Sequence, residues 1–200
     1  MPRAGPSAVA PAMRAAGPYR AEIDALFESL LDALGASGRT PFVLVGGAAS
    51  GSGASTIALS LAHAACNRGL RTLLVDRCER APTLSTFGED FEPFHLRRGG
   101  KSLRVLRRDG DGEILLQPLD SESGGGAAPD EGAFDLVLVD AGQFRSATRI
   151  ARDIRSVDAM IAVARNGSDA VRVDDELDRL GLSDLCVALA FNAARGRSAR

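Results

Sequence analysis

A glycine- and serine-rich loop between a buried strand and a helix limits what this chain can fold into more than any other feature. The apolar run PFVLVGG (41–47) predicts a buried strand, and the loop GGAASGSGAST (46–56) follows it. Residues 55–68 then predict a helix that stops at Gly69, and RTLLVD (71–76) predicts a second buried strand. Two buried strands joined by a loop and a helix over roughly thirty-five residues are typical of a parallel β-α-β crossover.

Further apolar runs extend this unit into a sheet. Buried strands are predicted at three more places: 134–140, 160–164 and 185–192. Helical spacing of apolar residues recurs in three stretches: 19–34, 147–155 and 169–180. The runs 102–107 and 113–117 flank the turn sequence DGDG and predict a hairpin. This alternation predicts an α/β fold of three layers, a mostly parallel central sheet with helices on both faces.

Composition divides the chain into one domain with short tails. Two hundred residues suffice for a single core. Residues 1–18 are rich in Pro, Ala and Gly without a lasting period, so we expect a disordered tail there, and a C-terminal tail over 196–200. The predicted domain therefore spans 19–195. Within it, the Gly-rich segment 120–133 predicts a flexible loop.

Charge and hydropathy argue against two kinds of partner. The net charge of −2 does not favour a nucleic-acid-binding protein. The apolar stretches are shorter than a membrane span, and residues 1–18 lack the hydrophobic region of a signal peptide. Three cysteines without metal-like spacing, Cys66, Cys78 and Cys186, fit a reducing compartment. We therefore expect a cytoplasmic protein with no nucleic-acid partner and no membrane span of its own.

The predicted loop has the properties of an anion site. Ligands of open parallel sheets bind at the carboxyl ends of the strands, where this loop lies. Gly51 and Gly53 allow backbone N–H groups to turn inward, and the N-terminus of the following helix adds positive potential. Ser55 stands where a phosphate-binding loop places its magnesium-binding hydroxyl, with Thr56 behind it. A Gly/Ser turn between a strand and a helix is also ordinary turn chemistry, so the loop alone does not decide.

Polar residues end three of the other predicted strands. Asp76 and Asp140 each complete an apolar run, where a carboxylate can hold a metal directly or through water. Asn192 ends the last run, where its amide can read a base edge. An aspartate at a strand end also caps helices. The joint occurrence of loop, carboxylates and amide in this order favours a phosphate-binding loop over these simpler interpretations.

Several motifs carry a resemblance to a known family. Residues 48–56 (AASGSGAST) are similar to the motif S-x-P-G-E-G-K-S-T, and 73–82 (LLVDRCERAP) to LLIDADLRRP. Residues 134–140 (FDLVLVD) match YDLVIID, 157–167 match AD-x-x-x-x-V-x-R-x-G, and 190–192 match VLN. In this order they resemble the MinD/ParA-like deviant-Walker ATPases. The resemblance is closer to the cytoplasmic ATPase domain of the bacterial tyrosine kinases that act with chain-length-determinant proteins in capsule and exopolysaccharide export.

The resemblance extends over residues 19–195 and implies a P-loop NTPase-like domain that binds ATP or ADP with Mg²⁺. The nucleotide would contact the loop and the residue that ends the last run: Gly51, Ser52, Gly53, Ala54, Ser55, Thr56 and Asn192. Mg²⁺ would be held by Ser55, Asp76 and Asp140, and the two aspartates would carry any residual catalysis. The resemblance also implies a homo-oligomer. It implies as partner a membrane chain-length-determinant or polysaccharide co-polymerase protein, which would recruit the chain to the inner face of the membrane.

The sequence departs from the family pattern mainly at functional positions. Ala54 replaces the P-loop lysine, Ala49 holds no signature lysine, and Cys78 replaces the second aspartate of the D-x-D pair. Tyr19 is the only tyrosine, so the tyrosine cluster that these kinases phosphorylate is missing. The first predicted helix lacks the family's Glu-Arg-Arg oligomerisation pattern, and a Gly-rich segment replaces the family's helix before FDLVLVD.

These losses predict a degenerate Walker A motif whose binding outlasts its catalysis. The P-loop lysine neutralises charge between the β- and γ-phosphates, and losing one such contact costs on the order of 10²–10³ in rate. We therefore expect a pseudo-enzyme of the tyrosine-kinase type with impaired or absent ATP hydrolysis, no tyrosine autophosphorylation and a regulatory or docking role in export. Two alternatives stay open: an active MinD/ParA-like ATPase with a substituted lysine, and an interaction scaffold that binds no nucleotide.

Overall fold

The computed structural model describes residues 18–36, 38–77, 92–95, 102–107, 113–117, 134–144 and 157–192. Its elements, in chain order, are α2 (Pro18–Leu34), β1 (Phe42–Gly47), α3 (Ala54–Cys66), β2 (Arg71–Asp76), β3 (Glu92–His95), β4 (Ser102–Arg107), β5 (Glu113–Gln117), β6 (Leu136–Gln143), β7 (Ala159–Ala164), α5 (Gly167–Leu180), the 3₁₀-helix η2 (Ser183–Leu185) and β8 (Cys186–Phe191). The predicted helix 147–155, the predicted loop 120–133, Cys78 and the tail residues 1–17 and 196–200 lie outside the described residues.

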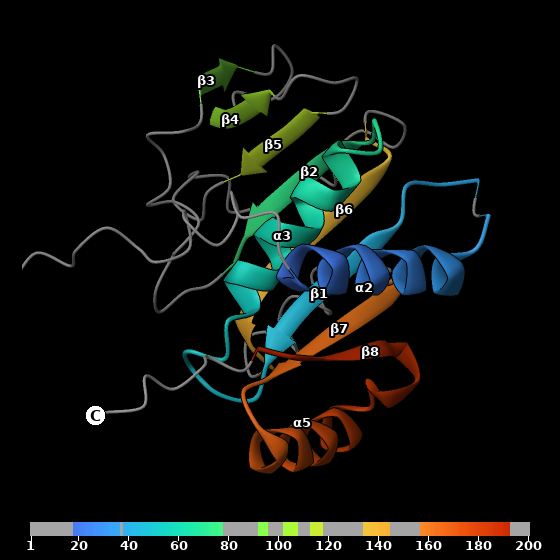
Figure 1. The fold of residues 1–200 in the computed structure, drawn as a ribbon, viewed down its shortest axis with the longest axis vertical. Coiled ribbons are helices and arrows are strands. Elements are labelled where there is room, and N and C mark those ends of the chain that lie inside the picture. Colours follow the sequence, from blue (N-terminus) through green and yellow to red (C-terminus); the bar gives the residue numbers. More distant parts are fainter. Residues whose placement is uncertain are drawn as a thin grey trace, which may run out of the picture.

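The described strands form one sheet, with α2 and α3 in front of it in Figure 1. The order of the strands is β3-β4-β5-β2-β6-β1-β7-β8. From β5 to β8 every neighbouring pair is parallel, while β4 pairs antiparallel with both β3 and β5. The predicted α/β fold and the predicted hairpin of 102–107 and 113–117 are therefore confirmed. β3, whose sequence EPFH shows no apolar alternation, adds a strand to the predicted sheet.

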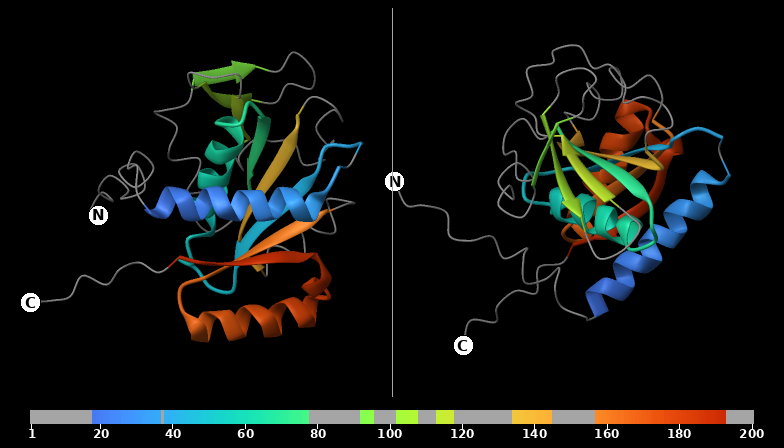
Figure 2. Two further views of the ribbon diagram at one scale, coloured as in Figure 1. Left: turned by 45° about the vertical axis from the view of Figure 1, so that its right-hand side comes forward. Right: turned by 90° about the horizontal axis from the view of Figure 1, so that it is seen from above.

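Two hydrophobic cores lie on the two faces of the sheet. Val43 and Val45 of β1 pack with residues of α2 and α3, whereas Leu44 between them packs with residues of α5. β6 alternates in the same way, with Leu138 in the first core and Val139 in the second. Figure 2 shows α5 across the sheet from α2 and α3. Burial on both faces explains why these strands are continuous apolar runs in the sequence.

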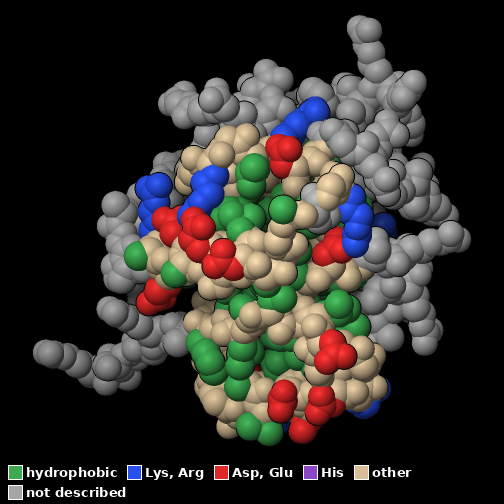
Figure 3. Space-filling view, turned by 90° about the vertical axis from the view of Figure 1, so that its right-hand side faces the viewer, with side chains coloured by type: hydrophobic (Ala, Val, Ile, Leu, Met, Phe, Trp, Pro, Cys, Tyr) green, Lys and Arg blue, Asp and Glu red, His purple; other side chains and the backbone are tan. Residues whose placement is uncertain are grey.

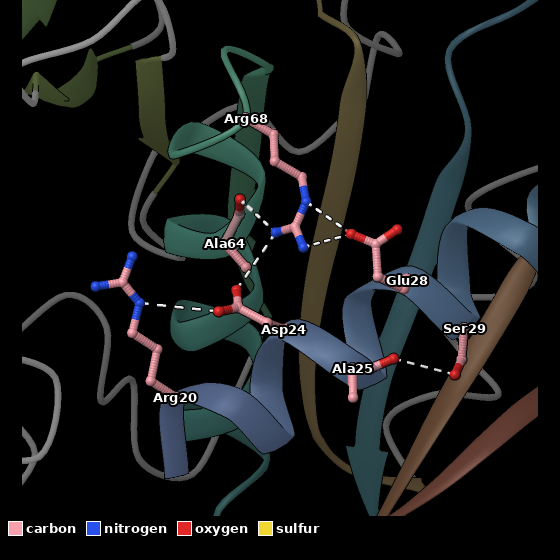
Figure 4. A network of polar contacts seen from close by, with 7 residues as sticks. All are labelled: Arg20, Asp24, Ala25, Glu28, Ser29, Ala64 and Arg68. Atoms are coloured by element: carbon pink, nitrogen blue, oxygen red, sulfur yellow. Dashed lines mark hydrogen bonds and ion pairs between the residues drawn. The ribbon is translucent and has the colours of Figure 1, made fainter. Parts of the chain in front are cut away.

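One arginine fastens α2 to α3. Arg68, just after α3, donates from Nε to Glu28 Oε1 at 3.0 Å and from Nη1 to Asp24 Oδ1 at 3.4 Å (Figure 4). Nη1 also donates to the carbonyl oxygen of Ala64 at 3.1 Å, and the guanidinium carbon lies 4.9 Å from the ring centroid of Phe27. A single side chain therefore joins ion pairs, a helix carbonyl and an aromatic ring across the two helices.

The last described elements, α5, η2 and β8, carry two surface features: a group of acidic side chains and an exposed strand at the edge of the sheet. Acidic side chains outnumber basic ones among the exposed residues of α5 and η2, and Figure 3 shows acidic side chains gathered at the lower end of the molecule. The exposed acidic residues there are Asp174, Asp175, Asp178 and Asp184. β8 forms one edge of the sheet, and its side chains Leu189 and Phe191 are 40% and 56% exposed. No helix within the described ranges is long and apolar enough to cross a membrane.

Candidate functional site

The loop between β1 and α3 has a backbone conformation that favours glycine at two positions. Gly51 and Gly53 have φ angles of 75° and 93°, in the left-handed region. α3 begins directly afterwards at Ala54, and no side chain caps its N-terminus. The amide of Ile57 donates to the Gly53 carbonyl at 3.0 Å, so the amides before Ile57 have no acceptor within the helix. The end of the loop therefore presents N–H groups and the positive end of a helix, which suits an anion.

Side chains hold the middle of this loop from two sides. Ser52 is 3% exposed. A Cβ on Gly47 would lie 2.2 Å from Ser52 Oγ and 2.8 Å from the Val163 carbonyl oxygen, so Ser52 fills the space that a side chain at position 47 would need. On the other side, Asn192 Nδ2 donates to the Ser52 carbonyl at 3.2 Å. The structure thus brings Asn192 to the predicted loop, where its amide contacts the protein backbone.

Two carboxylates meet beside the first turn of α3. Asp76 and Asp140 occupy paired positions on β2 and β6, and both are fully buried. Oδ1 of Asp140 accepts from the Gly142 amide at 2.9 Å, whereas Oδ2 is buried without a hydrogen-bond partner. Burial raises the pKa of Asp140 to about 6, opposed by the Ser55 hydroxyl and the Gly142 amide and reinforced slightly by Asp76. Loop, helix and strand ends therefore converge on the Asp140 carboxylate.

The donors at this point fit a hard cation. Asp76 and Asp140 offer carboxylate oxygens and Ser55 a hydroxyl, which are ligands that Mg²⁺ prefers. The orphaned Oδ2 of Asp140 is an acceptor that a cation would satisfy. No cluster of three or more His, Cys, Asp or Glu side chains occurs in the described part of the chain. A metal bound here would therefore share its coordination with water or phosphate oxygens.

The first residue of α3, Ala54, carries a buried methyl group at the position where the sequence resemblance would place a lysine. Ala54 is 4% exposed and belongs to the core between α3 and the sheet. Thr56, two residues on, is half-buried, and its carbonyl accepts from the Ser60 hydroxyl at 2.8 Å. The backbone amide of Arg77 donates to the Asp140 carbonyl at 2.9 Å, which fixes the end of β2 beside β6. The described part of the site thus offers backbone amides, two carboxylates and a hydroxyl.

The sequence pointed to most of these residues but not to one feature of the site. It predicted the loop, Ser55, Asp76, Asp140 and Asn192 as site residues. The structure brings Asn192 to the loop and Ser55 to Asp140, and it pairs Asp140 with Asp76 on the neighbouring strand. The sequence prediction missed the close packing of Ser52 against Gly47. The only signal for it was the glycine pair that ends the first apolar run.

No protein-family model and no curated protein matches the chain, but solved structures share its fold. The kinase domain of the Escherichia coli tyrosine kinase ETK matches with a TM-score of 0.60 and 15% identity, covering 100% of this chain and 85% of that one. The chimerical protein CapA2B2 matches with a TM-score of 0.57 and 16% identity, covering 88% of this chain and 86% of that one. At such identities the likeness establishes the shared α/β fold.

Proposed function

We propose that this chain is a regulatory or docking domain of capsule or exopolysaccharide export that binds adenine nucleotide and hydrolyses it poorly or not at all. The observation that carries the proposal is the convergence of the glycine loop, the uncapped N-terminus of α3, Ser55 and Asp140 around a site whose described residues include no lysine. Its domain is proposed to span 19–195, with tails at 1–18 and 196–200.

Nucleotide phosphates would bind to the backbone of the loop. The amides of Gly53 to Thr56 and the positive end of α3 attract an anion without needing any particular side chain. Ser55, Asp76 and Asp140 would hold Mg²⁺, which when bound would neutralise phosphate charge. Asn192 would complete the site from the end of β8. Binding of ATP or ADP with Mg²⁺ therefore relies on groups that this chain retains.

Turnover relies on groups that this chain lacks. Phosphoryl transfer depends on positioning and on charge stabilisation, to which a P-loop lysine contributes directly. The methyl group of Ala54 is uncharged and buried, and Cys78 stands in place of a second carboxylate. We therefore propose a pseudo-enzyme of the P-loop ATPase and tyrosine-kinase class. In such a protein the binding of nucleotide, rather than its hydrolysis, regulates the partner.

The proposed partner is a membrane chain-length-determinant or polysaccharide co-polymerase protein. The sequence resemblance and the fold shared with the ETK kinase domain support this choice. Such a partner would hold the cytoplasmic chain at the inner face of the membrane, where a homo-oligomer would assemble. A nucleic-acid partner is not proposed, because the net charge of −2 does not favour binding to a phosphate backbone.

Calorimetric titration with ATP and ADP, with and without Mg²⁺, tests the proposal. The wild type is expected to bind both nucleotides, and Ser55→Ala to lose about tenfold in Mg²⁺-dependent affinity, the scale of one charge-assisted contact. Ser183→Ala is the matched control, because Ser183 lies in η2 at the other end of β8. If the folded wild type binds neither nucleotide, the proposal fails and the scaffold interpretation replaces it.

A further inference from the structure

Asn192 follows β8 and contacts the loop between β1 and α3. Its backbone amide donates to the Ala164 carbonyl at 2.8 Å, which fixes its main chain at the end of β7. Its side chain then reaches the loop, where Nδ2 donates to the Ser52 carbonyl at 3.2 Å. The orientation of the amide follows from this contact, because only the NH₂ group can face a carbonyl oxygen.

The same side chain covers Gly53. A Cβ placed on Gly53 would lie 1.7 Å from Asn192 Nδ2 and 2.8 Å from its Cγ. Glycine is therefore favoured at position 53 for two reasons, the left-handed φ angle of 93° and the amide packed against it. Ser52, the residue before Gly53, packs against Gly47. Two side-chain contacts within the protein thus hold the loop.

We infer that Asn192 is a positioning residue, a latch that keeps the loop in its anion-binding shape before any ligand arrives. A P-loop lysine contributes positive charge to phosphate binding, and this chain has no lysine at position 54. The Asn192 contact would instead hold the loop backbone in one conformation. A loop that is already ordered loses less conformational freedom on binding, which favours affinity. Asn192 then acts on a bound phosphate through the Ser52–Gly53 backbone. The effect on ligand binding rests on the proposed function, whereas the contact between Asn192 and the loop does not depend on it.

Hydrogen exchange of the loop amides in the absence of ligand tests the latch directly. Asn192→Ala removes the contact, and Asn192→Asp keeps the size of the side chain but removes the donor. Both are expected to speed the exchange of the two hydrogen-bonded amides next to the contact by about five- to tenfold, the effect of losing one hydrogen bond. These are the Ser52 amide, which donates to the Ala49 carbonyl at 3.3 Å, and the Ile57 amide, which donates to the Gly53 carbonyl at 3.0 Å. Asn67→Asp is the matched control, since Asn67 is exposed at the far end of α3 and should leave these amides unchanged. Unchanged exchange in both Asn192 variants would overturn the inference.

A double-mutant cycle with Gly53→Ala separates the latch from a general loss of stability. In the wild type, Gly53→Ala meets both the positive φ angle and the Asn192 amide. In Asn192→Ala the amide is gone, and only the φ angle and the remaining Cβ of residue 192, at 3.3 Å, oppose the substitution. Gly53→Ala is therefore expected to reduce the folding equilibrium constant at least about fivefold less in the Asn192→Ala background than in the wild type. Strict additivity of the two substitutions would show that the residues do not touch.

ADP titration links the latch to binding. Asn192→Ala and Asn192→Asp are expected to weaken ADP binding by about five- to tenfold, and Asn67→Asp is expected to match the wild type. Full ADP affinity in folded Asn192 variants would refute the positioning role. If the wild type itself binds no ADP, the proposed function fails, while the exchange rates and the mutant cycle still decide whether the latch exists.

Discussion

The Asp140 carboxylate makes the stability of the protein depend on pH. Its pKa rises from 3.8 to about 6 on folding, mainly through burial, so the folded state holds the proton more tightly than the unfolded state. The resulting stability is fully present below pH 3.8 and is lost as pH rises through about 6. The difference of about 2 between these pKa values corresponds to about 3 kcal/mol of unfolding free energy.

Asp140→Asn is expected to remove this dependence and to stabilise the metal-free protein near neutral pH. Urea unfolding in the presence of EDTA, at about pH 4.5 and about pH 7.5, measures it as a difference between variant and wild type. Asp184→Asn, at an exposed position in η2, controls for the change in net charge. An Asp140→Asn variant whose stability keeps the wild-type dependence on pH contradicts the assignment.

Ala54→Lys should raise affinity for ATP and lower stability at the same time. A lysine here would add one charge-assisted hydrogen bond to phosphate, about 1–3 kcal/mol. Ala54 is 4% exposed within a core, so the longer side chain should also cost about 1–3 kcal/mol of folding free energy through overpacking. Calorimetry with ATP and thermal unfolding measure the two effects, and Ala33→Lys on the exposed side of α2 is the control. A folded variant with no gain in ATP affinity argues against a P-loop at this position.

Tyr19 should stay unphosphorylated when the protein is incubated with ATP and Mg²⁺. Its hydroxyl lies 3.1 Å from the Ser60 hydroxyl of α3, so a phosphate would have to break that contact. It is also the only tyrosine of the chain. Detection with an antibody against phosphotyrosine provides the test. A signal in the wild type that disappears in Tyr19→Phe runs against the prediction.

At the scale of whole elements, Arg68 should govern how firmly α2 is attached. Arg68→Ala is expected to cost about 1–2 kcal/mol, because it removes ion pairs to α2, a carbonyl contact and the packing over Phe27 together. Arg179→Ala is the matched control: Arg179 pairs only within α5, with Glu176, and is 60% exposed, so its loss should cost little. Urea unfolding measures both, and equal costs would contradict the special role of Arg68.

The sequence predicted those elements whose boundaries depend on local residues. β2 runs over 71–76 as expected, since an uninterrupted apolar run sets its length. β6 continues to Gln143 rather than ending at Asp140, because Gly142 and Gln143 pair with the glycines that end β1. α5 starts earlier than predicted, because the Asn166 side chain accepts from the Asp169 amide at 2.9 Å and caps the helix.

Part of the site was also predictable, because some of its residues lie at the ends of strands that the sequence marks locally. Asp76 and Asp140 stand at or near strand ends, so a parallel sheet brings them together once their runs are recognised. The contact of Asn192 with Ser52 joins residues 140 positions apart, and nothing in either segment signals the other. The burial of Ala54 and the unsatisfied Oδ2 of Asp140 likewise depend on packing that only the folded chain reveals.

At the scale of the whole molecule, ATP turnover by the isolated chain is expected to stay at background. The site keeps its loop and carboxylates but has no lysine at position 54, and positioning alone leaves the transition state short of positive charge. A coupled phosphate-release assay with Mg²⁺ measures the rate. Turnover above about 1 s⁻¹, within the ordinary range of enzymes, that is lost in Asp140→Asn would establish the active ATPase instead.

The position of β8 at the rim of the sheet has a consequence for how this protein behaves in concentrated solution. Among the described strands, none pairs with the outer side of β8, so its backbone N–H and C=O groups on that side form a template for another chain. Its sequence CVALAF contains no proline, lysine or other charged residue. Such residues usually protect edge strands against aggregation. We expect charge repulsion between the exposed aspartates of the adjoining α5 and η2 to oppose such pairing. Salt screens these charges, so we expect aggregation through the exposed edge of β8 to increase with ionic strength.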